Sequence, residues 1–268
     1  MKRFILILVC CLLAALPLAA KEKGKVALLF LMVGEHSQAT LWGQLMKKEA
    51  GFNAYVHNKE WLSHPYFLLH MLPKRVNTTW IEHMNAWRYL LSTALMDKDN
   101  ERFVFLSDGC VPLRPMAEIY NILMKEKRSR MSYSRPFWPK EDHREVLQVP
   151  EEHRYVNSEW IAVNRQHAQL MIEDQLILEH VKGHSHSAEA YPSILFSYYN
   201  HLKGEVLNKP ITYVDFLRGR DSHPYVFEEA TSENRAVLQK ARQDGYLFVR
   251  KIGPQFPAKL LLQVMKGK

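Results

Sequence analysis

A few charged side chains in this sequence could carry out group-transfer chemistry. Glu189 stands near the start of a predicted helix. Such a residue either stabilises the helix through its dipole or acts as a general base whose pKa is adjusted by burial. A basic turn holds Arg218 and Arg220, and the last apolar segment ends in Arg250 and Lys251. These four cations are either surface charges or groups that neutralise a leaving diphosphate in place of a metal ion.

Three local patterns of acidic and histidine residues give only weak support for a metal site. Asp97-Lys98-Asp99 has the D-x-D spacing with which many nucleotide-sugar transferases hold a divalent ion, but it precedes a predicted strand instead of following one. We interpret it as a solvated turn. Asp108, at a proper strand end, is a single carboxylate and a poor magnesium or manganese site. The pair His184 and His186 is a weak hint of zinc, since structural zinc sites need four ligands.

Nucleophilic and redox chemistry also lack their usual patterns. There is no G-x-S-x-G turn, and Cys110 has no obvious base beside it in the sequence. No G-x-G-x-x-G fingerprint follows the first predicted strand, so a dinucleotide cofactor is not favoured.

The segment 102–113 has the pattern of an element that positions a site. Four apolar residues, Phe103 to Leu106, favour a buried parallel strand, which stops at Ser107, Asp108 and Gly109. In open α/β sheets, ligands bind beyond the carboxyl ends of the strands. An ordinary strand followed by a turn would give the same local pattern, so the rest of the chain must decide.

The remaining patterns predict alternating strands and helices. The expected strands are 25–33, 52–57, 103–106, 159–163, 210–216 and 246–252. The expected helices are 39–48, 80–96, 117–125, 165–179, 188–199 and 232–244, with Thr79 and Glu82 as a capping box for the second. Segment 61–77 reads as a loop with a short strand, and 132–150 as a long loop. This order predicts a Rossmann-like α/β sheet followed by a second half of mixed elements.

The composition and the N-terminal segment limit the classes of protein to which this chain can belong. The chain has 268 residues, 47% hydrophobic and 24% charged, which are globular values. Its net charge of +8 is spread along the chain, which suits an anionic ligand, and no nucleic-acid-binding motif is present. Basic Met1–Arg3 and apolar residues 4–20 read as a signal peptide or signal anchor, leaving one domain at 21–268. Two of the three cysteines lie in that segment, so the mature chain forms no intramolecular disulfide.

Several segments together resemble the core-2/I-branching β-1,6-N-acetylglucosaminyltransferase family, in particular its plant-type branch. Lys25–Leu31 and Tyr55–His57 resemble the family's first two strands. Further resemblances are Asn100–Leu113 to F-V-L-L-S-E-S-C-I-P-L, Ser158–Ala168 to W-F/I-x-V/L-x-R-x-x-A, Ala188–Ser193 to D-E-H-Y-x-P-T, Thr212–Pro224 to T-W/Y-V-D-W-S-R-G-G-x-H-P, and Leu247–Ile252 to L-F-A-R-K-F. The order of the matches makes the resemblance specific.

The resemblance implies a GT-A-like fold, with a mixed sheet flanked by helices in a single domain, and an inverting mechanism without a metal. It implies transfer from a UDP-sugar, with GlcNAc as the expected sugar, to a glycan hydroxyl. The family's catalytic base falls on Glu189 and its diphosphate-binding lysine on Lys251, with Arg218 or Arg220 as the partner arginine. The expected lining of the donor or acceptor pocket is Ser107, Asp108, Cys110, Trp160 and His57.

Departures from the family pattern keep a second reading open. Asp108 replaces the usual Glu, Ala188 replaces an Asp and Phe216 replaces a Trp. The changes at Asp108 and Ala188 motivate a catalytically degenerate protein that binds glycans or nucleotides without turnover. An exported hydrolase is a third, weaker reading. The N-terminal segment predicts the secretory pathway or export, with a Golgi-type lumen in a eukaryote or the cell envelope in a bacterium, and possible membrane attachment through residues 4–20.

Overall fold

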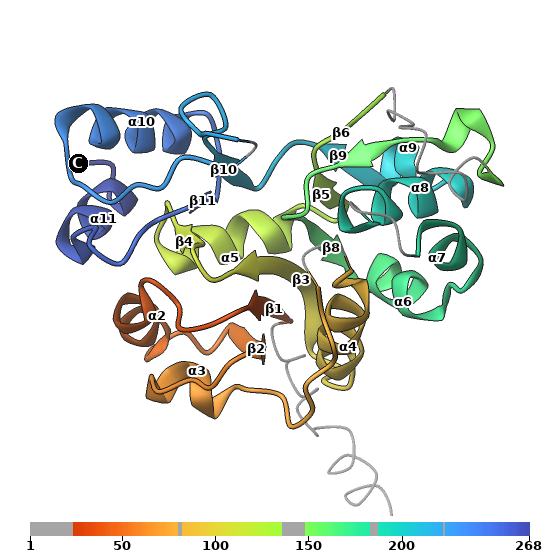
Figure 1. Cartoon of the computed structure of the whole chain (residues 1–268), viewed down its shortest axis with the longest axis horizontal. Coiled ribbons are helices and arrows are strands. Elements are labelled where there is room, and N and C mark those ends of the chain that lie inside the picture. Colours follow the sequence, from red (N-terminus) through yellow and green to blue (C-terminus); the bar gives the residue numbers. More distant parts are fainter. Residues whose placement is uncertain (1–23, 80–81, 136–147, 183–186, 222) are drawn as a thin grey trace, which may run out of the picture.

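The computed structural model of the chain (Figure 1) describes residues 24–79, 82–135, 148–182, 187–221 and 223–268. The predicted signal segment 1–20, most of the long loop (136–147) and the pair His184 and His186 lie outside these residues. The first half contains β1 (Lys25–Met32), α2 (Ala39–Met46), β2 (Phe52–Asn58), α3 (Pro65–Leu69), α4 (Met84–Leu95), β3 (Asn100–Ser107), β4 (Val111–Pro112), α5 (Met116–Lys125), β5 (Ser129–Met131) and β6 (Tyr133–Ser134). The second half contains η3 (Glu151–His153), β7 (Val156–Asn157), β8 (Ala162–Asn164), α6 (Arg165–Glu173), α7 (Leu176–Val181), η4 (Ser187–Glu189), α8 (Tyr191–Tyr198), α9 (Leu202–Glu205), β9 (Val206–Asn208), β10 (Thr212–Val214), α10 (Ser232–Gln243), β11 (Phe248–Arg250) and α11 (Ala258–Met265).

The centre of the molecule is a mixed sheet. Within the described part of the chain it has six strands, in the order β2-β1-β3-β8-β5-β9. Strands β1, β2 and β3 are parallel, as the opening strand–helix–strand pattern predicts. In their register Leu31 pairs with both His57 and Ser107, so the three carboxyl ends reach the same edge of the sheet. That shared edge is where a ligand site is expected.

Both faces of the parallel strands are covered by helices. Alternate residues of a strand point to opposite faces. Phe103 and Phe105 pack in a core cluster with residues of α4, α6 and α8, whereas Val104 and Leu106 pack in a second cluster with residues of α2 and α5. Double-sided burial explains why β1 and β3 contain continuous apolar runs. The predicted fold class is confirmed: a helix-flanked mixed α/β sheet in a single domain, consistent with a GT-A-like fold.

A second, smaller sheet brings the C-terminal basic residues to the end of β3. Its order is β10-β11-β4 among the described strands, and β4 follows β3 after a short turn. Val249 pairs with Val111, and the Ile252 amide donates to the Gly109 carbonyl at 3.0 Å. Figure 1 shows β10 and β11 with α10 and α11 as a unit beside β4. This pairing places Arg250 and Lys251 at the carboxyl end of β3.

Several predicted elements differ from the observed ones. The Thr79–Glu82 contact closes a turn in which the Glu82 amide donates to Thr79 Oγ1 at 2.9 Å, but α4 begins only at Met84, so the capping box was wrong. The predicted short strand within 61–77 is a single bridge from Met71 to Val56, and the segment forms helix α3 instead.

The predicted helix 165–179 is two helices, because the Asp174 carboxylate accepts from the Ile177 and Leu178 amides and starts a new helix, α7. The predicted helix 188–199 starts at Tyr191, so Glu189 ends a 3-10 turn instead of lying in the helix's first turn. The short elements β4, β5, β9, α9 and α11 were not predicted.

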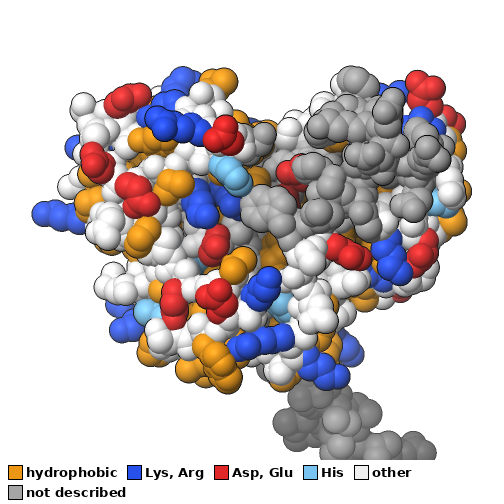
Figure 2. Space-filling model, in the orientation of Figure 1, with side chains coloured by type: hydrophobic (Ala, Val, Ile, Leu, Met, Phe, Trp, Pro, Cys, Tyr) orange, Lys and Arg blue, Asp and Glu red, His pale blue; other side chains and the backbone are white. Residues whose placement is uncertain are grey.

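On the side of the molecule shown in Figure 2, basic and acidic side chains of the described residues are interspersed. None of the described helices has the length and apolar character that crossing a membrane requires.

Candidate active site

The loop after β1 joins the ends of β3 and β11 into one rigid platform. The Ser37 amide donates to the Asp108 carbonyl at 3.1 Å, and Ser37 Oγ donates to the Ile252 carbonyl at 2.6 Å. The buried His36 ring places Nε2 3.0 Å from the Cys110 carbonyl. Burial lowers the pKa of His36 to about 3, so this imidazole stays neutral and donates to the carbonyl. Three segments far apart in the sequence therefore hold the strand end in place.

Ser107 is the centre of a compact polar cluster at that edge. Arg250 Nη1 donates to Ser107 Oγ at 2.7 Å, and Trp160 Nε1 donates to the same oxygen at 3.3 Å. The Arg250 guanidinium also lies over the Trp160 ring, 4.4 Å from its centroid. Arg250 Nε is buried and has no hydrogen-bond partner among the described residues. The cluster therefore holds the Arg250 guanidinium against the Trp160 ring and leaves one N–H donor of Arg250 without a partner among the described residues.

Lys251 reaches the same edge because residue 109 is a glycine. A Cβ atom on Gly109 would lie 2.6 Å from Lys251 Cγ, a distance at which one of the two must move. The Phe227 amide donates to the Lys251 carbonyl at 2.9 Å and holds the backbone there. No carboxylate of the described residues lies within ion-pair distance of Lys251. The Lys251 ammonium group is therefore not engaged in an ion pair within the described part of the chain.

Glu189 faces a second carboxylate, and the two have opposite pKa shifts. Burial and the negative charge of Glu159 raise the pKa of Glu189, and the positive charges of His83 and Arg250 only partly oppose this. Burial also disfavours the charged form of Glu159, but His83, 3.0 Å away, Arg250 and the Trp87 indole, 3.3 Å away, outweigh it and lower its pKa. Two nearby carboxyl groups with separated pKa values are a pattern of acid–base sites, in which the one with the raised pKa is the stronger base.

The two candidate arginines of the basic turn have different surroundings. Arg218 Nε donates to Asp215 Oδ2 at 2.7 Å, and its guanidinium lies over the Tyr225 ring, 4.2 Å from the centroid. Its Nη2 is buried without a hydrogen-bond partner in the described structure. Arg220 is exposed, and its backbone pairs with that of His223. Arg218 is thus a fixed, partly neutralised cation, whereas Arg220 lies in solvent.

The other predicted pocket residues lie at or below the same edge. Asp108 is half-buried in the turn. Cys110 is fully buried; its Sγ lies 3.3 Å from Ser107 Oγ, and burial raises the pKa of the thiol. His57 is buried at the end of β2, where Nε2 accepts from the Val76 amide at 2.9 Å and burial lowers its pKa. Cys110 and His57 therefore support the edge from within.

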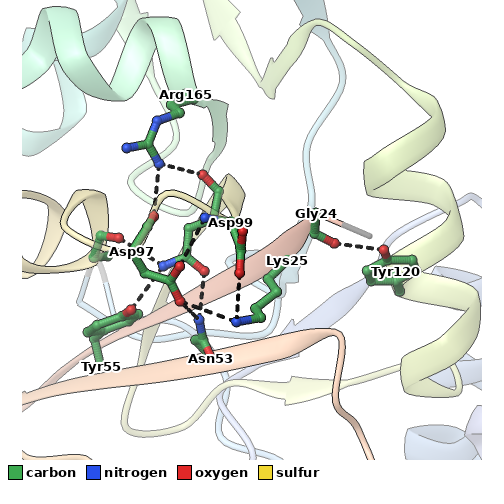
Figure 3. A network of polar contacts seen from close by, with 10 residues as sticks. Gly24, Lys25, Asn53, Tyr55, Asp97, Asp99, Tyr120 and Arg165 are labelled. Carbon is green, nitrogen blue, oxygen red and sulfur yellow. Dashed lines mark hydrogen bonds and ion pairs between the residues drawn. The ribbon is translucent and has the colours of Figure 1, made fainter. Parts of the chain in front are cut away.

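The D-x-D pair lies at the opposite edge of the sheet, where it ties strand starts together (Figure 3). Lys25 Nζ is 3.4 Å from Asp97 and 3.2 Å from Asp99, and Asn53 Nδ2 donates to Asp97 at 2.7 Å. Arg165 Nη1 donates to the Asp97 carbonyl at 3.0 Å. Both carboxylates are part-exposed and hold the turn before β3, which agrees with the turn interpretation.

Sequence reasoning missed Glu159 and His83, although Glu159 directly precedes Trp160 in a segment already assigned to the pocket. Their approach to Glu189 depends on the tertiary structure.

A sequence profile of the Core-2/I-Branching enzyme family matches residues 26–238. The chain belongs to that family. The family match includes Ser107, Trp160, Glu189 and both arginines of the basic turn, whereas Arg250 and Lys251 lie beyond its end. The chain is also similar to "Glycosyltransferase BC10" of Oryza sativa subsp. japonica, with 28% identity over 173 residues. That alignment covers 60% of this chain and 43% of the rice protein, so the chain corresponds to less than half of its relative's length.

Proposed function

We propose that this Core-2/I-Branching chain is an inverting glycosyltransferase that moves a sugar from a UDP-sugar to a glycan hydroxyl without a metal ion. GlcNAc and a β-1,6 linkage are the first candidates, because the sequence resembles enzymes of that type. The observation that carries the proposal is that the positive charge of Arg250 acts on Glu189, whose pKa is raised, while Arg250 and Lys251 both lie at the carboxyl end of β3.

In the proposed reaction, Glu189 takes the proton of the acceptor hydroxyl while the hydroxyl oxygen attacks the anomeric carbon of the donor. The bond from that carbon to the diphosphate oxygen breaks, and UDP leaves with the bonding electrons. Lys251 and an arginine of the 218–220 turn stabilise the charge that develops on the diphosphate. Arg250, held by Ser107 and Trp160, adds a fixed positive charge nearby.

Glu159 has a supporting role in this proposal. Its negative charge raises the proton affinity of Glu189, while its contact with His83 keeps Glu159 itself ionised. Glu159 therefore makes Glu189 a stronger base without taking up the proton itself.

The test is a donor screen on the purified chain, followed by a transfer assay. UDP and UDP-sugars should raise the melting temperature, because a ligand at 100 times its Kd stabilises the folded state by about 2.7 kcal/mol. The donor-induced rise should be the same with and without EDTA, each compared with its own ligand-free control. Donor binding that requires a divalent ion would refute metal independence, and the absence of any UDP-sugar binding would refute the transferase assignment.

A degenerate binding protein is the second candidate, and residue 188 motivates it. Ala188 stands where the family pattern has an acid, and it is buried in the core cluster beside Glu189. An acid there could have contributed to the site. Donor binding without hydrolysis, and without transfer to any member of a glycan acceptor panel, would favour this candidate.

We also propose that residues 1–20 direct the chain into the secretory pathway or out of the cell, and that residues 4–20 attach it to a membrane if they are not cleaved. The basic, apolar and small-residue order of that segment supports this. The intact mass of the mature protein tests cleavage, and fractionation of the producing cells tests attachment.

A further inference from the structure

Two histidines and a glutamate converge where helix α6 meets the segment around α9. His167 lies in the first turn of α6, and His201 and Glu205 lie at the two ends of α9. His167 Nε2 is 3.4 Å from Glu205 Oε2, and His201 Nδ1 is 3.0 Å from the same oxygen. One ligand atom of each residue lies within 4.8 Å of the others. We propose that these three side chains form a binding site for a zinc-class divalent cation.

The spacing and the donor set both fit such an ion. Zinc bonds of about 2.0–2.2 Å in a tetrahedron place neighbouring ligand atoms roughly 3.3–3.6 Å apart. The two contacts to Glu205, at 3.4 and 3.0 Å, are close to that edge length. Two imidazoles and one carboxylate are a zinc ligand set that leaves a fourth position for water. Calcium and magnesium prefer oxygen ligands, so they are poor candidates.

His167 is the ligand that the fold itself prepares. The side chain is fully buried, its Nε2 has no hydrogen-bond partner among the described residues, and its ring stacks on Phe196 with centroids 4.4 Å apart. On the other side of the ring, Nδ1 lies 2.6 Å from Ser129 Oγ, which already accepts from the Asn164 amide. If Nδ1–H donates to this oxygen, Nε2 carries the free electron pair that a metal requires.

The backbone of α9 brings two of the ligands together and leaves the cluster open to solvent. Lys203 is non-helical, and Gly204 has φ of 91°, a left-handed conformation that glycine adopts without strain. The resulting kink directs both His201 and Glu205 toward α6. Side-chain exposure is 23% for His201 and 45% for Glu205, so an ion and a water molecule can enter from that side.

The cluster is separate from the proposed transferase site. Asn164 caps α6 and lies three residues before His167. It pairs with Arg102, near the start of β3, whereas Ser107 is the last residue of that strand. Five residues of strand correspond to roughly 16 Å. A cation there would join α9 to α6 and act on stability, and transfer chemistry at the other edge would proceed without it.

The test titrates zinc into the full chain after it has been stripped with EDTA and dialysed. We expect one zinc ion per chain, a rise in melting temperature, and no response to magnesium. His201→Gln and Glu205→Gln change part-exposed side chains and should preserve the fold, as circular dichroism can verify. Each should weaken zinc binding at least tenfold in calorimetry and reduce the thermal shift accordingly.

The matched controls change histidines outside the cluster. His180→Gln, and the double variant His184→Gln with His186→Gln, should bind zinc as the wild type does. Failure of the wild-type chain to bind zinc would overturn the proposal and leave the cluster as an ion pair. Zinc binding that survives both His201→Gln and Glu205→Gln but is lost in the His184 and His186 variant would also overturn it.

Discussion

Replacing Glu189 by glutamine removes the proposed base and keeps the shape of the side chain. We expect kcat for sugar transfer to fall about 10²- to 10⁴-fold, which corresponds to about 3–5 kcal/mol of transition-state stabilisation. No neighbouring carboxylate of the described residues can take over as the base, so we expect this whole loss of kcat. Glu159, the neighbouring carboxylate, is engaged by His83 and Trp87, and its lowered pKa makes it too weak a base to replace Glu189.

The same substitution should not weaken the fold. Because burial and Glu159 raise the pKa of Glu189, the unfolded chain loses this proton at a lower pH than the folded chain. The stability associated with Glu189 is therefore complete below its unfolded pKa, about 4.3, and is lost as the pH rises through the raised folded value. Glutamine has no charge to bury, so Glu189→Gln should melt at or above the wild-type temperature at pH 7, with the difference vanishing near pH 4.

The pH dependence of kcat/KM links the loss of activity to the base. Wild-type transfer should rise with pH as Glu189 loses its proton. Glu159→Gln, the matched control, removes the negative charge that raises the pKa of Glu189, so its acid limb should move to lower pH while transfer persists. A Glu189→Gln protein that transfers sugar within threefold of the wild-type rate would refute the assignment. Equal losses in both variants, with no shift of the acid limb, would show that neither carboxylate acts as the base.

Three further predictions test the platform, the D-x-D pair and the buried histidine. Gly109→Ala forces the Lys251 side chain away from the strand end, so the Kd for UDP should rise about tenfold or more while the circular dichroism spectrum stays unchanged. Asp97→Asn combined with Asp99→Asn should lower the free energy of unfolding by about 1–2 kcal/mol in urea titrations. Transfer per folded molecule should not change in that variant. A complete loss of transfer would instead show that the D-x-D pair takes part in catalysis. Because the pKa of His36 is lowered to about 3, stability should be complete above its unfolded pKa of about 6.5 and fall as the pH drops toward 3. The total loss from this group is on the order of 5 kcal/mol, and urea titrations of His36→Gln should show a smaller acid dependence than the wild type.

Strongly patterned segments were predicted well because their signal is local. The apolar runs at 25–33 and 103–106 lie within β1 and β3 or within one residue of them, since strands buried on both faces need apolar residues at every position. The prediction that chemistry gathers beyond Ser107 rested on the same signal, because a strand end is visible in the sequence. The fold class followed from the order of such segments.

Elements that depend on distant partners were missed or displaced. Strands β4, β5 and β9 have two or three residues each, too few for a periodic pattern, and they form because other strands lie beside them. Glu189 was placed in a helix because apolar residues follow it, whereas α8 begins only at Tyr191, with Pro192 in its first turn.

The sequence by itself determined where the long apolar strands lie along the chain, the points at which they end, and the types of side chain available to a site, including Glu189 and Lys251. It did not determine what surrounds those side chains. Only the tertiary structure placed Glu159 and His83 beside Glu189, stacked Arg250 on Trp160, and joined the D-x-D pair to Lys25. The physical reason is that periodicity along a chain reports which positions are buried, whereas a carboxylate's proton affinity depends on charges that lie close in space and far apart in the sequence.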